Sequence, residues 1–185
     1  MLETKPITKG SPEVSKVEQL MHAVFPKSEI IPMAFLLARA EKEFIDFWAF
    51  YEQGEFVGFT YSITKDGLTF LQYLAVNSTV QSKGYGSKML SHIQAQHPGN
   101  RLALNLEVLD EHAENSEQRK RRRAFYAKNN YEETGIITRV NGNTLDTLIL
   151  GGNTTIEELQ RVFKTFTGFI LGLFIRYQLS YAEQK

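Results

Sequence analysis

The chain has 185 residues, 42% of them apolar and 23% charged, which is typical of one globular domain and excludes a disordered or collagen-like chain. Its 21 basic and 21 acidic residues cancel, so no long-range field favours nucleic acid, and no nucleic-acid partner is expected. Cysteine is absent, which excludes disulfides and thiolate metal sites. The first residues show no apolar run of the kind found in secretory signals, so the cytoplasm is the expected location.

Two helices are predicted at the start of the chain. Ser11 and Pro12 are typical of a helix start, and apolar residues at helical spacing continue to Pro26. Residues 31–40 predict a second helix, with Pro32 in its first turn.

Three strands are predicted next, over residues 45–51, 56–63 and 68–76, because β-branched and aromatic side chains gather between turns. The turn around Asp66-Gly67 favours a hairpin, so the three strands are expected to form a meander. Residues 86–96 predict a helix that ends before Pro98.

Three further elements are predicted before residue 151: a strand over residues 102–109, a charged helix over 115–128 and a hairpin of 131–140 with 144–150. The hairpin turn is predicted at Asn141-Gly142-Asn143. This order of strands and helices predicts an α/β or α+β sheet domain.

The remaining residues, 153–185, predict an amphipathic helix that starts at Thr154 or Thr155 and packs on the domain or on a second subunit. A homodimer through this helix is one expectation. The apolar run of residues 166–175 lies between Lys164 and Arg176 and is shorter than the ~20 residues that a membrane helix needs, so no membrane span is expected. The apolar stripe comprises Leu159, Val162, Phe163, Phe166, Phe169, Ile170, Leu173, Phe174 and Tyr177.

The most informative segment joins the strand at residues 68–76 to the helix at 86–96. Gly84 and Gly86 let the backbone turn tightly just where a helix begins, so amide donors and the positive end of the helix dipole gather there. Such a place suits a pyrophosphate. The order Gly86-Ser87-Lys88 does not fit the Walker pattern, and Met89 replaces the third glycine of the dinucleotide fingerprint.

The string Gln81-x-x-Gly84-x-Gly86, behind a strand that ends Leu74-Ala75-Val76, resembles the acetyl-CoA motif of the GNAT N-acetyltransferase superfamily. Residues 124–131 are similar to the family's Phe-Tyr-x-Lys-x-Gly-Phe segment, with Asn130 at the usual glycine. The resemblance covers about residues 1–150, and it implies a central mixed, mostly antiparallel twisted sheet of about six to seven strands flanked by helices, over residues 1–152, plus the C-terminal helix.

The resemblance also implies where acetyl-CoA binds as the acyl donor. The strand backbone would hold the pantetheine arm and the thioester, and the loop amides would hold the pyrophosphate. The implied binding residues are Leu74, Ala75, Val76, Gln81, Ser82, Lys83, Gly84, Tyr85, Gly86 and Ser87.

Two catalytic residues are expected. By resemblance, Tyr126 is the tyrosine that protonates the departing thiolate; the alternative is that it only fills space between helix and sheet. Glu107, on the predicted strand, could deprotonate the incoming ammonium, or it could simply face solvent. Arg119 and Arg122 lie on the helical face of Tyr126, where they could contact coenzyme A phosphates or form a solvated surface.

The scattered histidines offer no metal-ligand spacing, so no metal is expected. The expected function is therefore transfer of an acetyl group from acetyl-CoA to a primary amine of a small-molecule or peptide acceptor by direct attack on the thioester. The alternative is a catalytically silent acyl-CoA-binding or oligomeric interaction module of the same fold. Residues 21–40 and 131–150 are expected to select the acceptor, as in the family that the chain resembles.

Overall fold

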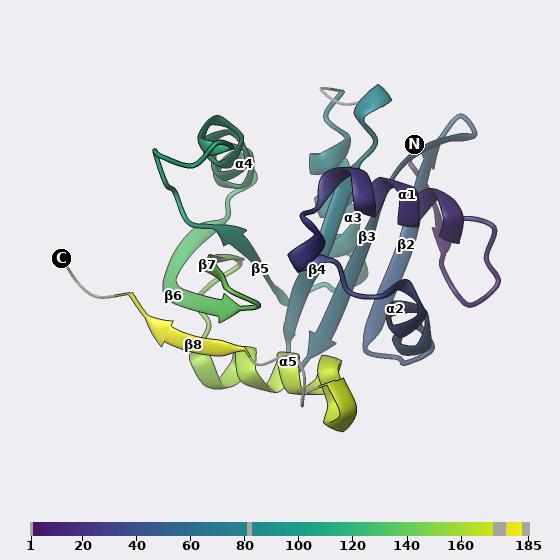
Figure 1. Ribbon diagram of the computed structural model, residues 1–185. Helices are drawn as coiled ribbons and strands as arrows, with labels where there is room; N and C mark the ends of the chain where they lie inside the picture. Colours follow the sequence, from purple (N-terminus) through teal and green to yellow (C-terminus); the bar gives the residue numbers. More distant parts are fainter. Residues whose placement is uncertain (1, 81–82, 172–176, 183–185) are drawn as a thin grey trace. The chain divides into compact units, whose positions relative to one another are not determined.

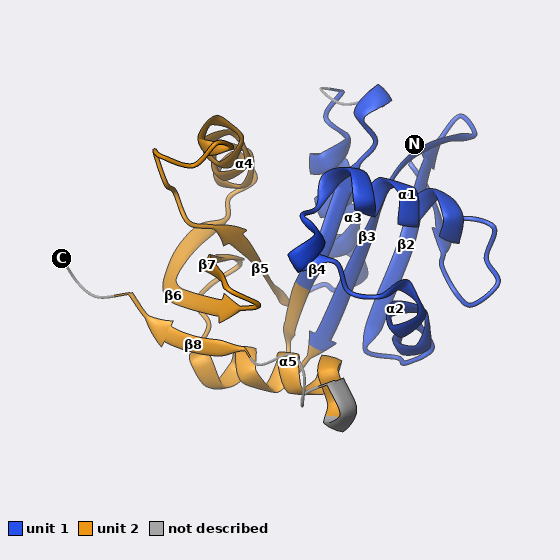
Figure 2. Ribbon diagram, in the orientation of Figure 1, with its two compact units in different colours: residues 1–64, 71–98 blue, residues 65–70, 99–185 orange. Residues whose placement is uncertain are grey.

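The computed structural model describes residues 2–80, 83–171 and 177–182. They form two compact units, residues 1–64 with 71–98 and residues 65–70 with 99–185 (Figure 2). The strand β4 is divided, because its first three residues belong to the second unit and the others to the first.

The first unit holds four neighbouring strands in the order β1-β2-β3-β4, and the register is antiparallel for β1 with β2 and for β2 with β3. The predicted meander of three strands is thereby confirmed, and β1 is an addition at its edge. The elements are β1 (Glu3–Pro6), α1 (Val14–Val24), the 3-10 turn η1 (Lys27–Glu29), α2 (Met33–Ala40), β2 (Ile45–Glu52), β3 (Glu55–Lys65), β4 (Leu68–Val76), the 3-10 turn η2 (Ser78–Val80) and α3 (Tyr85–Gln96).

Successive side chains of a strand point to opposite faces of the sheet, and in the first unit both faces are apolar. One face meets α1 and α2: the Tyr61 hydroxyl donates to the Leu36 carbonyl of α2 at 3.3 Å, and Phe47 packs edge-on against the Tyr61 ring. The other face meets α3 (Figure 1). Buried residues form a cluster there, and partly buried side chains of β4 pack against it. The cluster is Phe50, Val57, Val80, Tyr85 and Met89, and Leu74 and Val76 pack against it.

Tyr73 of β4 points to the α1–α2 face and holds the segment between these helices. Its buried hydroxyl accepts from the Ile31 N–H at 3.0 Å and donates to the Glu29 carbonyl at 2.6 Å. Phe25 packs edge-on against the same ring at 4.9 Å. One side chain of the strand thus satisfies two backbone groups of an irregular segment.

The second unit has the strand order β4-β5-β7-β6-β8, in which β4 contributes its first residues. The pairs β5–β7, β6–β7 and β6–β8 are antiparallel. The predicted hairpin turn is confirmed by positive φ angles of 50° at Asn141 and 79° at Gly142. The elements are β5 (Arg101–Glu107), α4 (Ser116–Lys128), β6 (Glu132–Val140), β7 (Asn143–Leu150), α5 (Ile156–Leu171) and β8 (Gln178–Tyr181).

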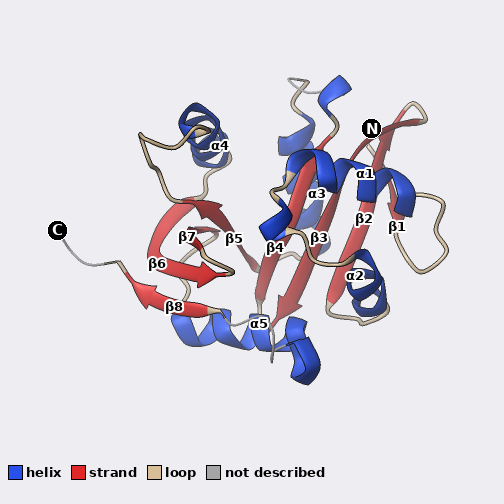
Figure 3. Cartoon of the chain, viewed as in Figure 1, coloured by secondary structure: helices blue, strands red, loops and turns tan. Residues whose placement is uncertain are grey.

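The helix α5 (Figure 3) belongs to the second unit and begins with a reciprocal cap. The Thr155 hydroxyl accepts from the Glu158 N–H at 3.3 Å, and the Glu158 carboxylate accepts from the Thr155 N–H at 3.0 Å. Arg101 of β5 holds the same carboxylate with two hydrogen bonds of 2.8 and 3.1 Å. Four residues of the apolar stripe are buried, namely Leu159, Val162, Phe163 and Phe166, and the Phe163 ring meets the Phe70 ring at 4.9 Å.

The C-terminal segment differs from the single long helix that the sequence predicts. The backbone of α5 is interrupted at Gly168, where φ is 60° and ψ is −162°, and residues 178–181 are strand β8. Tyr177, predicted on the helix stripe, instead stacks on Phe163 at 4.1 Å. The predicted helical positions at residues 172–176 lie outside the described residues, and the domain boundary after residue 152 stays a prediction.

The α/β class and the mostly antiparallel sheet are confirmed, with eight strands in the described chain in place of six to seven. The additional strands, β1 and β8, have four residues each. Ser11 is not the N-cap of α1, which begins at Val14; its hydroxyl accepts from the Thr8 N–H in the preceding turn at 2.9 Å. Within the described residues, no helix is long and apolar enough to cross a membrane.

Candidate functional site

The end of β4 is fixed by Asn77, which the sequence analysis did not select. Its N–H donates to the Val57 carbonyl at 2.8 Å, and its side-chain amide donates to the Phe56 carbonyl at 3.2 Å. Its side-chain oxygen accepts from the Thr79 N–H at 3.2 Å, and its carbonyl accepts from the Val80 N–H at 3.1 Å. Asn77 therefore sets both the end of the strand and the direction of the loop that follows.

Gly58 of β3 lies directly against the predicted thioester strand. A Cβ at this position would overlap the Ala75 carbonyl oxygen and would lie 3.1 Å from both the Ala75 carbonyl carbon and the Val76 Cα. Only glycine allows this approach of β3 to the backbone of residues 75–76. The sequence alone does not single out Gly58, because a glycine within a strand gives no indication of which backbone it approaches.

The predicted anion loop leads into α3 through Gly84, which has a left-handed backbone with φ 76° and ψ 11°. As the N-cap residue, Gly84 has no side chain that could cap this helix end. The first backbone bond of the helix runs from the Lys88 N–H to the Gly84 carbonyl at 3.2 Å, so the amides of Tyr85, Gly86 and Ser87 lie in the first turn, where a helix leaves N–H groups unpaired. The predicted residues Gln81 and Ser82 lie outside the described residues.

Tyr85 anchors this first turn to the sheet. Its ring is buried in the cluster described above, and its hydroxyl donates to the Glu52 carboxylate at the end of β2. This hydrogen bond is the main cause that lowers the pKa of Glu52, and it raises the pKa of Tyr85. Lys88 lies 3.6 Å from the same carboxylate, so a cation of α3 offsets the charge of Glu52 while Tyr85 donates to it.

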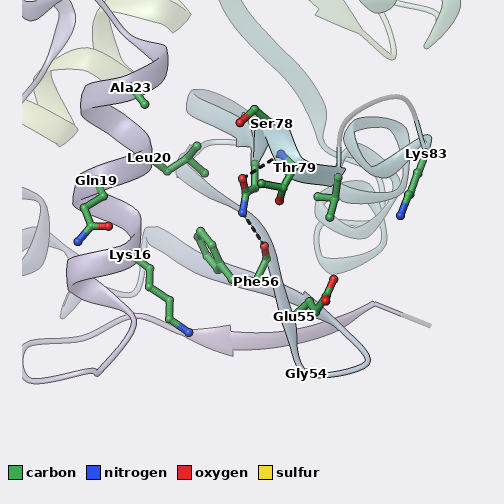
Figure 4. A pocket seen from close by; sticks show the side chains of 12 residues that line it. Lys16, Gln19, Leu20, Ala23, Gly54, Glu55, Phe56, Ser78, Thr79 and Lys83 are labelled. Carbon is green, nitrogen blue, oxygen red and sulfur yellow. Dashed lines mark hydrogen bonds between the residues drawn. The ribbon is translucent and has the colours of Figure 1, made fainter.

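A pocket of about 730 Å³ adjoins the loop on the side of α1 (Figure 4). Asn77 and Thr79 line it beside Phe56, and Figure 4 shows Lys16 and Lys83 at opposite sides. Neither lysine forms an ion pair with any residue in the described part of the chain. The pocket therefore carries two cationic groups next to the predicted diphosphate loop.

Glu107, the predicted base, lies at the end of β5 in a cluster of cations from α4. Its carboxylate accepts from the Asn115 side-chain amide at 3.1 Å, forms an ion pair with Arg122 and lies 3.6 Å from Arg119. Arg119 also donates to the Val108 carbonyl at 2.8 Å. These contacts join α4 to β5, and both carboxylate oxygens of Glu107 are engaged.

The arginines of α4 have protein partners, which favours a structural role over the solvated surface that the sequence left open. Arg123 forms ion pairs with Glu133 of β6 and Asp146 of β7. Lys120 pairs with Glu117 along the exposed side of the helix at 3.0 Å. Most of the positive charge on α4 is therefore balanced within the second unit.

Tyr126 lies near the end of α4, partly buried, and its ring packs edge-on against Phe125 at 5.0 Å and Tyr131 at 5.5 Å. Burial raises the pKa of Tyr126 to about 12, and the positive charge of Arg122 acts in the opposite direction. The helix ends at Asn129, and Asn130 has a φ of 63°, the left-handed conformation for which asparagine substitutes for glycine.

The predicted residues fall into two groups. Leu74, Ala75, Val76 and residues 83–87 belong to the first unit, whereas Glu107 and Tyr126 belong to the second. Among the described residues, no group of three or more histidine, aspartate or glutamate side chains could hold a metal ion.

Residues 43–133 match the family described as the acetyltransferase (GNAT) domain. This match includes the predicted motif strand, the loop, β5 and the helix with Tyr126. No curated protein sequence matches the chain significantly.

Solved structures show the same fold at low sequence identity. A candidate GNAT-family acetyltransferase from Bacteroides thetaiotaomicron is 17% identical with a TM-score of 0.68, over 92% of this chain and 98% of that one. An aminoglycoside 6'-N-acetyltransferase complexed with coenzyme A is 18% identical with a TM-score of 0.63, over 80% and 96%. The ribosomal-protein-S18-alanine N-acetyltransferase from Escherichia coli is 17% identical with a TM-score of 0.59, over 85% and 97%.

Proposed function

We propose, from the membership of residues 43–133 in the GNAT acetyltransferase family, that this protein transfers an acetyl group from acetyl-CoA to a primary amine. The observation that carries the proposal is the helix entry at Gly84. A left-handed glycine there is the N-cap of α3 and offers no side chain to pair with the first-turn amides. The amides and the positive end of the helix dipole suit a diphosphate.

The residues near this helix entry fit the phosphate end of acetyl-CoA. The amides of Tyr85, Gly86 and Ser87 would bind diphosphate oxygens, and Lys83 adds a cation on the same loop. Because Glu52 is already paired with Tyr85 and Lys88, its charge is compensated and opposes an incoming anion less. Gln81 and Ser82 complete the proposed set by sequence.

The strand residues Leu74, Ala75 and Val76 would hold the pantetheine arm and the thioester through their backbone. Gly58 and Asn77 fix this backbone from β3 and from the loop, which keeps the binding strand in one conformation before the donor arrives. A main-chain N–H directed at the thioester oxygen would contribute ~2.7–4 kcal/mol as an oxyanion donor.

In the proposed reaction the neutral amine attacks the thioester carbonyl, the carbon–nitrogen bond forms and the carbon–sulfur bond breaks. Tyr126 would give its proton to the departing thiolate, and the proton lost from nitrogen would go to solvent. Since burial raises the pKa of Tyr126 to about 12, the hydroxyl holds its proton until the thiolate forms. Its phenolate must then be stabilised by neighbouring groups.

Glu107 remains a predicted base, and its contacts favour a different contribution. A carboxylate that two guanidinium groups and an amide already hold has little freedom to take a proton from an ammonium group. Through the same contacts, Glu107 would fix α4 and thereby position Tyr126.

The acceptor is proposed to be a small-molecule or peptide amine. Two structural neighbours carry names that state an aminoglycoside and a ribosomal-protein alanine as acceptors, so both classes belong in the test. The cytoplasmic location and the homodimer stay predictions. The inward-facing Leu159, Val162, Phe163 and Phe166 of α5 are already buried within one chain, so they need no second subunit to cover them.

The decisive experiment measures binding of acetyl-CoA by calorimetry and release of free thiol against a panel of aminoglycosides, polyamines and peptides with free N-termini. Tyr126→Phe is expected to bind acetyl-CoA normally and to lose about 100-fold or more in kcat, the usual contribution of a general acid. Tyr181→Phe, which changes an exposed tyrosine of β8, is the matched control and should retain full activity. Binding without thiol release from any amine would favour the silent module, and absence of binding would refute the proposal.

A further inference from the structure

Tyr131 carries a buried hydroxyl that the proposed reaction does not yet use. The residue is 5% exposed, and its hydroxyl oxygen has no hydrogen-bond partner in the described structure. Leaving a buried hydroxyl unsatisfied destabilises a protein, and phenylalanine would fill the same space without that cost. A tyrosine at this position therefore needs an explanation outside the packing of the free protein.

The turn at the end of α4 places the Tyr131 ring beside the Tyr126 ring. The left-handed Asn130 reverses the chain, and the Tyr131 N–H donates to the Tyr126 carbonyl at 3.1 Å. The two rings then meet edge to face, with centroids 5.5 Å apart and planes at 69°. The arrangement is fixed by backbone geometry on both sides of the turn.

The two phenols also interact electrostatically. A negative charge on Tyr126 raises the pKa of Tyr131, in addition to the larger effect of burial. Arg122, one helical turn before Tyr126, lowers the pKa of Tyr126 and so favours its phenolate. A phenolate at Tyr126 would thus be favoured by the charge of Arg122, and the unused hydroxyl of Tyr131 belongs to the ring that packs against it.

We propose that Tyr131 is a positioning residue whose hydroxyl donates a hydrogen bond to the Tyr126 oxygen while Tyr126 gives its proton to the departing thiolate. The inference rests on the proposed acetyl transfer. The carbon–nitrogen bond forms and the carbon–sulfur bond breaks as before. The Tyr126 proton moves to sulfur, and the phenolate is reprotonated from solvent, which receives the proton lost from nitrogen. Tyr131 keeps its own proton throughout.

The test compares Tyr131→Phe, Tyr126→Phe and the double variant in the thiol-release assay, together with their Tm. Because a hydrogen bond to a charged group contributes about 1.5–3 kcal/mol, Tyr131→Phe should lower kcat about 10-fold or more and leave the KM for acetyl-CoA unchanged. Its Tm should be unchanged or higher, since an unsatisfied hydroxyl is removed. In the Tyr126→Phe background, the same substitution should have no further effect.

The matched control is Tyr61→Phe, which removes a buried hydroxyl that does have a partner, the Leu36 carbonyl. This variant should lose stability and retain kcat, the opposite of the result expected for Tyr131→Phe. Full kcat in Tyr131→Phe, an equal loss in the Tyr126→Phe background, or failure of Tyr131→Phe to fold would each overturn the inference while acetyl transfer stands. A wild-type protein that releases no thiol with any amine removes the proposed function itself, and the inference with it.

Discussion

The contact between Gly58 and β4 makes Gly58→Ala a demanding test of the binding strand. The added methyl group would overlap the Ala75 carbonyl oxygen and lie 3.1 Å from the Val76 Cα. Both neighbours are backbone atoms, so no side chain can rotate away to make room. Relief requires a shift of β3 or of residues 75–76.

The magnitude follows from the kind of atom that must move. Overpacking of a core typically costs about 1–3 kcal/mol, and a backbone obstacle places this substitution at the upper end, about 3 kcal/mol. For a chain of this length, each kcal/mol lowers Tm by about 2–4 °C, so a decrease of about 6–12 °C is expected. The folded fraction should also bind acetyl-CoA more weakly, because residues 75–76 are displaced.

The assay is thermal and urea denaturation of Gly58→Ala beside Gly54→Ala. Gly54 lies in the adjacent turn with a φ of 80° and nothing within 4 Å of an added Cβ, so its substitution reports only the cost of a left-handed alanine. That cost is about 1–2 kcal/mol. Equal stability of the two variants, or wild-type affinity of Gly58→Ala for acetyl-CoA, would show that the strand yields easily and that the reasoning is wrong.

Two further predictions concern the start of α5 and the end of β4. The hydrogen bonds from Arg101 lower the pKa of Glu158 to about 2 in the folded protein, below its ordinary value. The ion pair therefore stabilises the fold at a pH above the ordinary carboxyl pKa, and this stabilisation is lost as the pH falls towards the pKa of the folded state. Glu158→Gln should therefore cost about 1–2 kcal/mol near pH 7 and progressively less below about pH 4 in urea titrations, and a pH-independent difference would contradict the ion pair. Asn77→Ala removes the hydrogen bonds to Phe56 and Thr79, so it should cost about 1–2 kcal/mol and weaken acetyl-CoA binding in calorimetry, whereas unchanged affinity would argue against a role in shaping the loop.

Much of the fold could be predicted because its elements carry clear periodicity. The strand β4 has the bounds that the sequence predicts, Leu68–Val76, since an apolar run lies between an Asp-Gly turn and a polar loop. The edge strands β1 and β8 gave no such signal, because four residues are too few for alternation to show. Tyr177 follows the helical spacing of the stripe, yet it stacks on Phe163 from outside α5.

The candidate site was predictable where one residue type indicates the conformation of the backbone. A glycine before a helix indicates a left-handed entry, and Gly84 has that conformation. From the sequence, Asn77 cannot be distinguished from an ordinary turn residue, because the Phe56 carbonyl to which its side chain donates is 21 positions away. The sequence likewise predicts Glu107 as a free carboxylate on a strand, because its ion pair with Arg122 exists only after α4 has folded onto β5.

The hydroxyl of Tyr73 has a consequence for how the protein could change its substrate over evolution. This one oxygen satisfies the Ile31 N–H and the Glu29 carbonyl, so two backbone groups of the segment are held by a side chain from outside it. Substitutions at residues 28–30 leave both hydrogen bonds in place, because each of them is made to the backbone of the segment. If this segment selects the acceptor, as the sequence predicts, new acceptor preferences could arise there one substitution at a time while Tyr73 of β4 keeps its backbone in place.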